Sequence, residues 1–109
     1  MKSTKTVVLV LVTAPDIKFA RGLARAALEK RLVACVNLVP GIESHYWWQD
    51  RIENSAEVLM VMKTTVGRLA ALENHIARLH PYDTPEILAV PVRSGSKAYL
   101  AWVKNSLTK

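Results

Sequence analysis

The sequence predicts a small α+β fold in which a four-stranded antiparallel sheet carries two helices on one face, with a further helix at the C-terminus. Short apolar or β-branched runs alternate with two segments of helical periodicity. The resulting order, β-α-β-β-α-β plus a last helix, is the split β-α-β arrangement. At 109 residues the chain predicts a single domain, residues 1–109, because so small a chain buries only about two-thirds of the surface that its unfolded form exposes.

The first strand and helix are predicted before residue 31. Val7–Thr13 is a continuous, largely β-branched run, which is typical of a central strand. The lysines before it resemble a weak signal peptide, but the apolar run is short and no small-x-small cleavage pattern follows, so a core strand is the preferred interpretation. From Ile17 to Lys30 apolar residues recur at helical spacing, and Asp16 is placed to cap this helix.

Two long strands are predicted to form a hairpin. The first begins at Ala34–Val39, is interrupted by a bulge or bend at Pro40-Gly41 and resumes in "IESHYWW"; "QDR" is the tip, and the second strand runs back from Ile52. Tyr46, Trp47 and Trp48 are consecutive, so both faces of the hairpin are apolar there. A helix layer covers only one face, and we therefore expect the other to meet a second copy of the chain.

The second half of the chain predicts a helix, an edge strand and a final helix. Val66–Leu79 has helical periodicity, with Thr65 available to cap it, and Pro81 ends it. Ile87–Val92 is the last strand, and Pro91 places it at an edge because proline cannot donate to a ladder. The helical apolar stripe is Leu69, Leu72, Ile76 and Leu79, joined by Glu73, and the short final helix carries Tyr99, Trp102, Val103 and Leu107.

Composition excludes several classes of function. The net charge of +6 is scattered rather than gathered in a patch. The single cysteine, Cys35, excludes an internal disulfide and a four-cysteine zinc site within one chain, which fits a reducing compartment. No stretch approaches the length of a membrane span. There is no nucleophile elbow, Gly-rich phosphate loop or pair of histidines at metal-ligand spacing, so the prediction is a protein that is not an enzyme.

The segment "HPYDTPE" is the strongest candidate site. It places His80, Tyr82, Asp83 and Glu86 between a helix and a strand, and two prolines restrict the backbone that carries them. A loop that faces a ligand is one interpretation. The alternative is structural: His80 favoured by the helix C-terminal dipole, and the two acids serving as a turn cap and a solvent-facing strand start.

Four other polar or reactive residues are candidate site residues, and each also has a structural interpretation. Cys35 in an apolar strand is expected to be buried, with a ligand or reactive thiol as the alternative. Lys63 either extends along the surface to water or faces an acid such as Glu57 or Glu86. His45 is expected to face solvent or a neighbouring subunit. His75 lies off the apolar stripe and is expected on the surface.

Four ordered segments resemble the CutA family, the divalent-cation tolerance proteins: "ACVNLVPGIESHYWW", "EVLMVMKTT", "LHPYDTPEILAVPV" and "YLAWV". The resemblance covers nearly the whole chain. It implies a ferredoxin-like fold, a homotrimer whose long hairpins pair across subunits, a cytoplasmic location and an association with copper and other divalent metals. It also implies similarity in fold and assembly to the PII-type signalling proteins. No reaction comes with it.

One copper site described in that family uses a cysteine before "TAPD" and two histidines before "PY". The matching positions here are Val12, Leu79 and His80, so a single donor remains. One imidazole with nearby carboxylates is an unselective set that would take Cu(II), Zn(II) or Ni(II) weakly.

Two functions are therefore expected, and a third is disfavoured. The first is a trimeric protein of divalent-cation tolerance with a weak metal site at His80, to which Cys35, Asp83 and Glu86 are possible additions. The alternative is a PII-like module that holds a small anionic ligand in inter-subunit clefts lined by Trp48, Lys63, Tyr82, Asp83 and Glu86. No nucleic acid or membrane partner is expected, because the paired aromatic motif that stacks RNA bases is missing.

Overall fold

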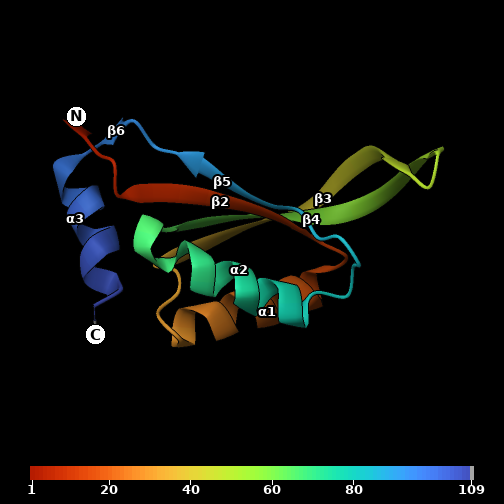
Figure 1. Ribbon diagram of the computed structural model, residues 1–109, viewed down its shortest axis with the longest axis horizontal. Coiled ribbons are helices and arrows are strands. Elements are labelled where there is room, and N and C mark those ends of the chain that lie inside the picture. Colours follow the sequence, from red (N-terminus) through yellow and green to blue (C-terminus); the bar gives the residue numbers. More distant parts are fainter. Residues whose placement is uncertain (109) are drawn as a thin grey trace.

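The structure is a computed structural model, and it describes residues 1–108. Figure 1 shows the elements in chain order. They are β1 (Lys2–Ser3), β2 (Val7–Ala14), α1 (Ile17–Glu29), β3 (Cys35–Trp48), β4 (Arg51–Thr65), the 3₁₀ helix η1 (Val66–Arg68), α2 (Leu69–Leu79), β5 (Ile87–Pro91), β6 (Ser94–Gly95) and α3 (Lys97–Ser106). Among these residues, no helix has the length and apolar character needed to cross a membrane.

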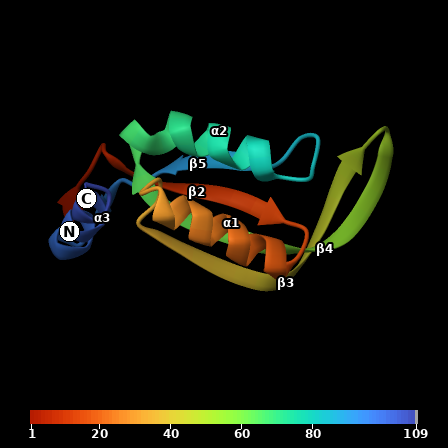
Figure 2. The ribbon, with the colours of Figure 1, turned by 90° about the horizontal axis from the view of Figure 1, so that it is seen from below.

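The four-stranded antiparallel sheet of the split β-α-β fold is confirmed. Its strand order is β3-β4-β2-β5, so β2 is central and β5 lies at an edge, as predicted. Helices α1 and α2 lie side by side on one face of this sheet, and α3 lies at one end (Figure 2). The sequence did not predict the short second sheet, in which β1 pairs with β6 through Lys2 opposite Gly95 and Ser3 opposite Ser94.

Local sequence explains the ends of most elements. Asp16 caps α1, because its Oδ1 accepts the backbone N–H of Phe19 at 2.8 Å. Thr65 precedes η1 but makes no side-chain capping hydrogen bond, so the predicted cap is wrong. The predicted helix begins instead with a 3₁₀ turn and becomes α-helical at Leu69. His80 is the C-cap residue and has extended backbone geometry, as expected for a residue that precedes proline.

The hairpin of β3 and β4 has the predicted tip and bulge. Gln49 and Asp50 form the turn with φ of 49° and 63°, the positive values that a tight two-residue hairpin turn needs. The register shifts between Val39 and Ile42, and Gly41 has φ 74°, so the interruption at Pro40-Gly41 is a bulge at which glycine supplies the left-handed geometry. The hairpin extends well beyond the helices (Figures 1 and 2).

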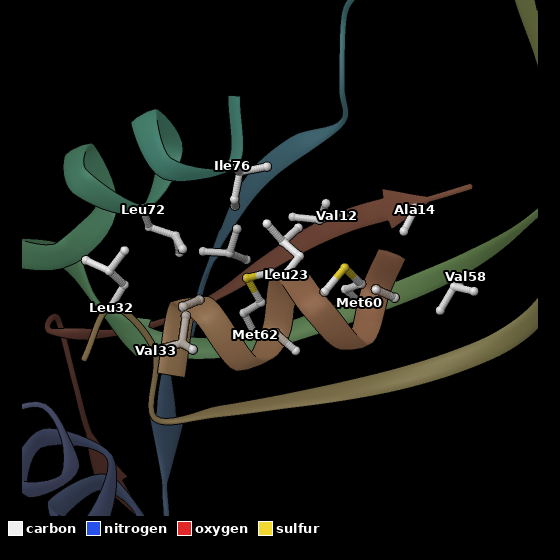
Figure 3. Packing of buried hydrophobic residues seen from close by; sticks show 14 residues of the cluster. Val12, Ala14, Leu23, Leu32, Val33, Val58, Met60, Met62, Leu72 and Ile76 are labelled. Carbon is white, nitrogen blue, oxygen red and sulfur yellow. The ribbon is translucent and has the colours of Figure 1, made fainter. Parts of the chain in front are cut away.

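The main core lies between the two helices and the sheet. Figure 3 shows Met60 and Met62 from β4 packed beneath Leu23, while Leu72 and Ile76 project from α2. The buried face of α2 is Leu72, His75 and Ile76, whereas Leu79 is 48% exposed. The buried face therefore differs from the predicted apolar stripe near the C-terminal end of the helix, where it includes His75 and excludes Leu79. A smaller cluster of Val7, Leu100 and Val103 holds α3 against the end of the sheet.

His75 is buried, which corrects the expectation that it lies on the surface. It is 3% exposed, and neither ring nitrogen has a hydrogen-bond partner among the described residues. Burial lowers its pKa below 6.5, and the positive charges of Lys30 and Arg78 lower it further. His75 is therefore a neutral side chain in the folded protein at neutral pH.

Replacing His75 with leucine should reduce the acid sensitivity of the fold. As pH falls below about 6.5, the unfolded chain binds a proton at His75 that the folded chain does not. The free energy of unfolding then falls by at most about 1.4 kcal/mol per pH unit until the lower pKa of the folded state is reached. Unfolding of wild type and His75→Leu between pH 7.5 and 5, at one protein concentration, measures this loss. An exposed control on the same helix, Asn74→Leu, removes no titratable group and should keep the wild-type slope; an equal slope in His75→Leu would refute the prediction.

The sheet face opposite α1 and α2 is apolar and largely uncovered. Side chains in register on this face include Leu9 with Val90 and Leu11 with both Val61 and Leu88. Leu88 is 55% exposed, and α3 covers only the end of the face near Val7. We call this surface the open sheet face. Its apolar character continues into the hairpin, where Tyr46, Trp47, Trp48 and Ile52 are all exposed.

Candidate functional site

A cleft of about 810 Å³ lies between the hairpin and the loop that follows α2. Both elements lie at the end of the molecule away from α3 (Figures 1 and 2). Aromatic side chains and carboxylates dominate its walls, and hydroxyl groups complete them. The aromatic residues are Tyr46, Trp47, Trp48 and Tyr82, the carboxylates are Glu57, Asp83 and Glu86, the hydroxyl residues are Thr13, Ser44 and Thr84, and His45 and Pro85 complete the lining.

His80 fastens the start of the loop to strand β2. It is 7% exposed; its Nε2 donates to the carbonyl oxygen of Thr13 at 2.8 Å, and its Nδ1 accepts the backbone N–H of Tyr82 at 3.2 Å. Because a carbonyl oxygen only accepts, Nε2 carries the proton and the lone pair of Nδ1 is already engaged. The ring also packs edge-on against Phe19 and beside Tyr82. A metal ion reaches neither nitrogen unless one of these hydrogen bonds breaks.

Tyr82 joins the loop to the hairpin through Glu57. Its hydroxyl donates to Glu57 Oε2 at 2.9 Å. Burial, together with this hydrogen bond and the charge of Glu57, raises the pKa of Tyr82 to about 12, so the hydroxyl stays protonated. Glu57 itself is 8% exposed, and neither ion pair in the described part of the chain includes it. The cleft thus contains a buried carboxylate without a countercharge.

Glu86 and Asp83 lie at the exposed rim of the same cleft. Removal of water by the surrounding protein raises the pKa of Glu86 above 4.5, and the negative charge of Glu57 raises it further. Two carboxylates therefore repel one another across the cleft. Within one chain no lysine or arginine lines it. The cleft is a site of negative potential in a protein of net charge +6.

The predicted site residues fall into two separate groups. Tyr82, Asp83, Glu86 and Trp48 line the cleft, and His80 lies behind it as the support of the loop. Cys35 and Lys63 do not line the cleft.

Cys35 and Lys63 lie opposite one another near the α3 end of the sheet, with Lys63 Nζ 3.8 Å from Cys35 Sγ. Lys63 is six residues from Glu57 along one strand, or roughly 20 Å at about 3.3 Å per residue. Within one chain, the expectation that Lys63 faces Glu57 or Glu86 is therefore wrong. Tyr99 adjoins this pair: burial raises the pKa of Tyr99, and Cys35 contributes to the increase.

The donor groups do not fit a closed metal site within one chain. Among residues 1–108, no three histidine, cysteine or acidic side chains lie close enough together to hold an ion. His45 is paired with Glu43 on the exposed hairpin, its Nε2 2.7 Å from Glu43 Oε2. A metal ion in the cleft would therefore complete its coordination with water.

Sequence reasoning overlooked the central role of Glu57. It considered this residue only as a partner for Lys63. The available indication was the position of an acid directly before the apolar run Val58–Met62, where burial of the strand begins. Thr13 was also overlooked, because it contributes a backbone carbonyl that no side-chain pattern reveals.

Comparison with known proteins finds relatives along nearly the whole chain. The family model described as "CutA1 divalent ion tolerance protein" matches residues 8–106. The "Divalent-cation tolerance protein CutA" of Pectobacterium atrosepticum is 46% identical over 100 residues, which cover 92% of this chain and 91% of that protein. The chloroplastic "Protein CutA 1" of Oryza sativa is 44% identical over 109 residues, which cover 97% of this chain but only 62% of that protein. The solved structure of CutA from Synechococcus elongatus matches with a TM-score of 0.93 at 39% identity, covering 98% of this chain and 95% of that one.

Proposed function

Since the chain belongs to the CutA1 divalent ion tolerance family, we propose that it is a binding protein linked to divalent-cation tolerance, with no reaction of its own. The names of its relatives are not enzyme names. The observation that carries the proposal is Glu57, a buried carboxylate without a countercharge, facing Glu86 across the cleft. A bound cation would offset both the cost of burying one charge and the repulsion between two.

We propose that the working form is a homotrimer in the cytoplasm. The open sheet face supports self-association, because a contiguous exposed apolar surface continues into an aromatic hairpin. Thr13, Glu57 and Glu86 occupy the same alternating positions as the residues of this face, so the cleft lies at its end. A second copy seated on the face would therefore border the cleft. The single cysteine supports a reducing compartment.

The charge of the cleft favours the first of the two functions expected from the sequence, cation binding, over the binding of a small anion. A small anionic ligand would need cations in the cleft, and Lys63, the cation expected there, lies near the other end of the sheet in the same chain. Carboxylates favour Cu(II), Zn(II) or another divalent ion. Because one chain offers too few protein donors to enclose an ion, we expect weak binding, with Kd of about 10⁻⁴ M or higher, as for oxygen sites of low affinity.

Replacing Glu57 with glutamine should weaken this divalent-cation binding by about tenfold or more, because it removes the buried charge while keeping the shape of the side chain. Calorimetric titration of Cu(II) and Zn(II) into the wild type and Glu57→Gln measures the change. Glu73→Gln, which removes an exposed charge from α2, is the matched control. A His45→Ala variant tests the contribution of the exposed Glu43–His45 pair, whose histidine also lines the cleft. If His45→Ala abolishes binding and Glu57→Gln leaves it intact, the cation binds through His45 of the hairpin and not through Glu57.

A further inference from the structure

We propose that the cleft binds a small organic ammonium compound, a protonated amine that carries an apolar group. The proposal rests on the acidic cleft of the proposed function and goes beyond it, because it adds a class of organic ligand to the divalent cations. Three features support it: a largely buried carboxylate without a countercharge, aromatic walls, and a volume larger than a metal ion requires.

The first feature is Glu57. It is more than nine-tenths buried and lines the cleft. Oε2 accepts the hydroxyl of Tyr82, while the described residues supply no hydrogen-bond donor to Oε1. An ammonium group in the cleft would donate to this oxygen and neutralise the charge at the same time, and charge-assisted hydrogen bonds are among the stronger ones in proteins.

The second feature is the chemistry of the walls. Trp47 and Trp48 of β3 line the cleft together with Tyr46 and Tyr82. The faces of tryptophan and tyrosine rings attract cations, and their area also accepts an apolar group. A hydrated metal ion makes little use of such walls. An organic cation uses both the rings and the carboxylates.

The third feature is the volume of the cleft, together with the hydrogen bonds that position Glu57. A volume of about 810 Å³ lies within the range of small-molecule sites. The hydrogen bonds of His80 to Thr13 and Tyr82, and of Tyr82 to Glu57, hold the carboxylate in place before a ligand arrives. Such preorganisation lowers the entropy cost of binding.

The test compares three probes of similar shape and different charge: phenethylammonium, neutral 2-phenylethanol and anionic 3-phenylpropionate. Binding to the full chain at pH 7.5 is followed by tryptophan fluorescence and calorimetry. We expect phenethylammonium to bind at least about tenfold more tightly than either analogue, and Glu57→Gln to remove most of that preference. Glu73→Gln should keep it. The fluorescence change should persist in Trp102→Phe, because Trp102 lies on α3, away from the cleft.

Each other outcome overturns the inference. Equal binding of the ammonium and the alcohol would show an apolar groove that does not use Glu57. Tighter binding of the carboxylate would show an anion site, which also contradicts the proposed function. If none of the probes binds while Zn(II) binding depends on Glu57, the ammonium inference fails and the proposed function stands.

Discussion

Replacing Leu88 with glutamate should convert the proposed trimer into monomers. Leu88 lies on edge strand β5 opposite Leu11, within the open sheet face, and is 55% exposed in a single chain. In an assembly that covers this face, each subunit would bury a carboxylate without a partner, at a cost of several kcal/mol. Light scattering with size-exclusion chromatography should give a mass near three times 12.1 kDa for the wild type and near one for the variant.

The matched control for this experiment is Leu79→Glu. Leu79 is 48% exposed, a similar fraction, but lies at the end of α2 on the helix side of the sheet. This variant should keep the mass of the wild type. A wild type that is monomeric at micromolar concentration, or a Leu88→Glu variant that stays trimeric, would rule out assembly through the open sheet face.

The fold could be predicted from sequence because its elements follow local patterns. Continuous apolar runs fixed the central strands, Asp16 and Pro81 bounded the helices, and Pro40-Gly41 and "QDR" marked the bulge and the turn. These features act through neighbouring residues. The pairing of β1 with β6 is too short to leave such a pattern, because two residues carry no periodicity.

The orientation of α2 could not be predicted in the same way. Leu72 and Ile76 define the middle of its buried face. Whether the residues on either side of that line are buried depends on how the helix is rotated against α1 and the sheet. In the structure His75 is buried, whereas Leu79 is exposed. Tertiary packing, and not the periodicity of the helix, determines the limits of this buried face.

The candidate site was predictable in its loop and not in its charge. His80, Tyr82, Asp83 and Glu86 were identified from their density between two prolines, and they do line or support the cleft. The sequence also placed a cation, Lys63, beside these residues, but the position of Lys63 along β4 excludes this within one chain. Lys63 lies six residues beyond Glu57 on β4, so one strand carries the two to opposite ends of the sheet.

Replacing His80 with alanine should lower the free energy of unfolding by about 3 kcal/mol, because the change leaves a cavity and an unsatisfied buried carbonyl at Thr13. The loop would also lose its attachment, so the Tyr82–Glu57 hydrogen bond and the binding of cations should weaken together. Helix α2 should still end at Leu79, since Pro81 rather than the imidazole ends it. Urea unfolding, circular dichroism and Cu(II) titration measure these three effects.

Two further variants separate a positioning role of His80 from metal coordination. His80→Gln keeps an amide that can donate to the Thr13 carbonyl, so it should recover part of the lost stability and cation binding. His45→Ala, which removes an exposed histidine, should change stability by less than about 0.5 kcal/mol. A metal ligand would show the reverse pattern: His80→Ala would lose copper with little loss of stability, because a coordinating nitrogen must be free of the hydrogen bonds that the fold uses. That result would make the loop a metal site and refute its role as the support of the cleft.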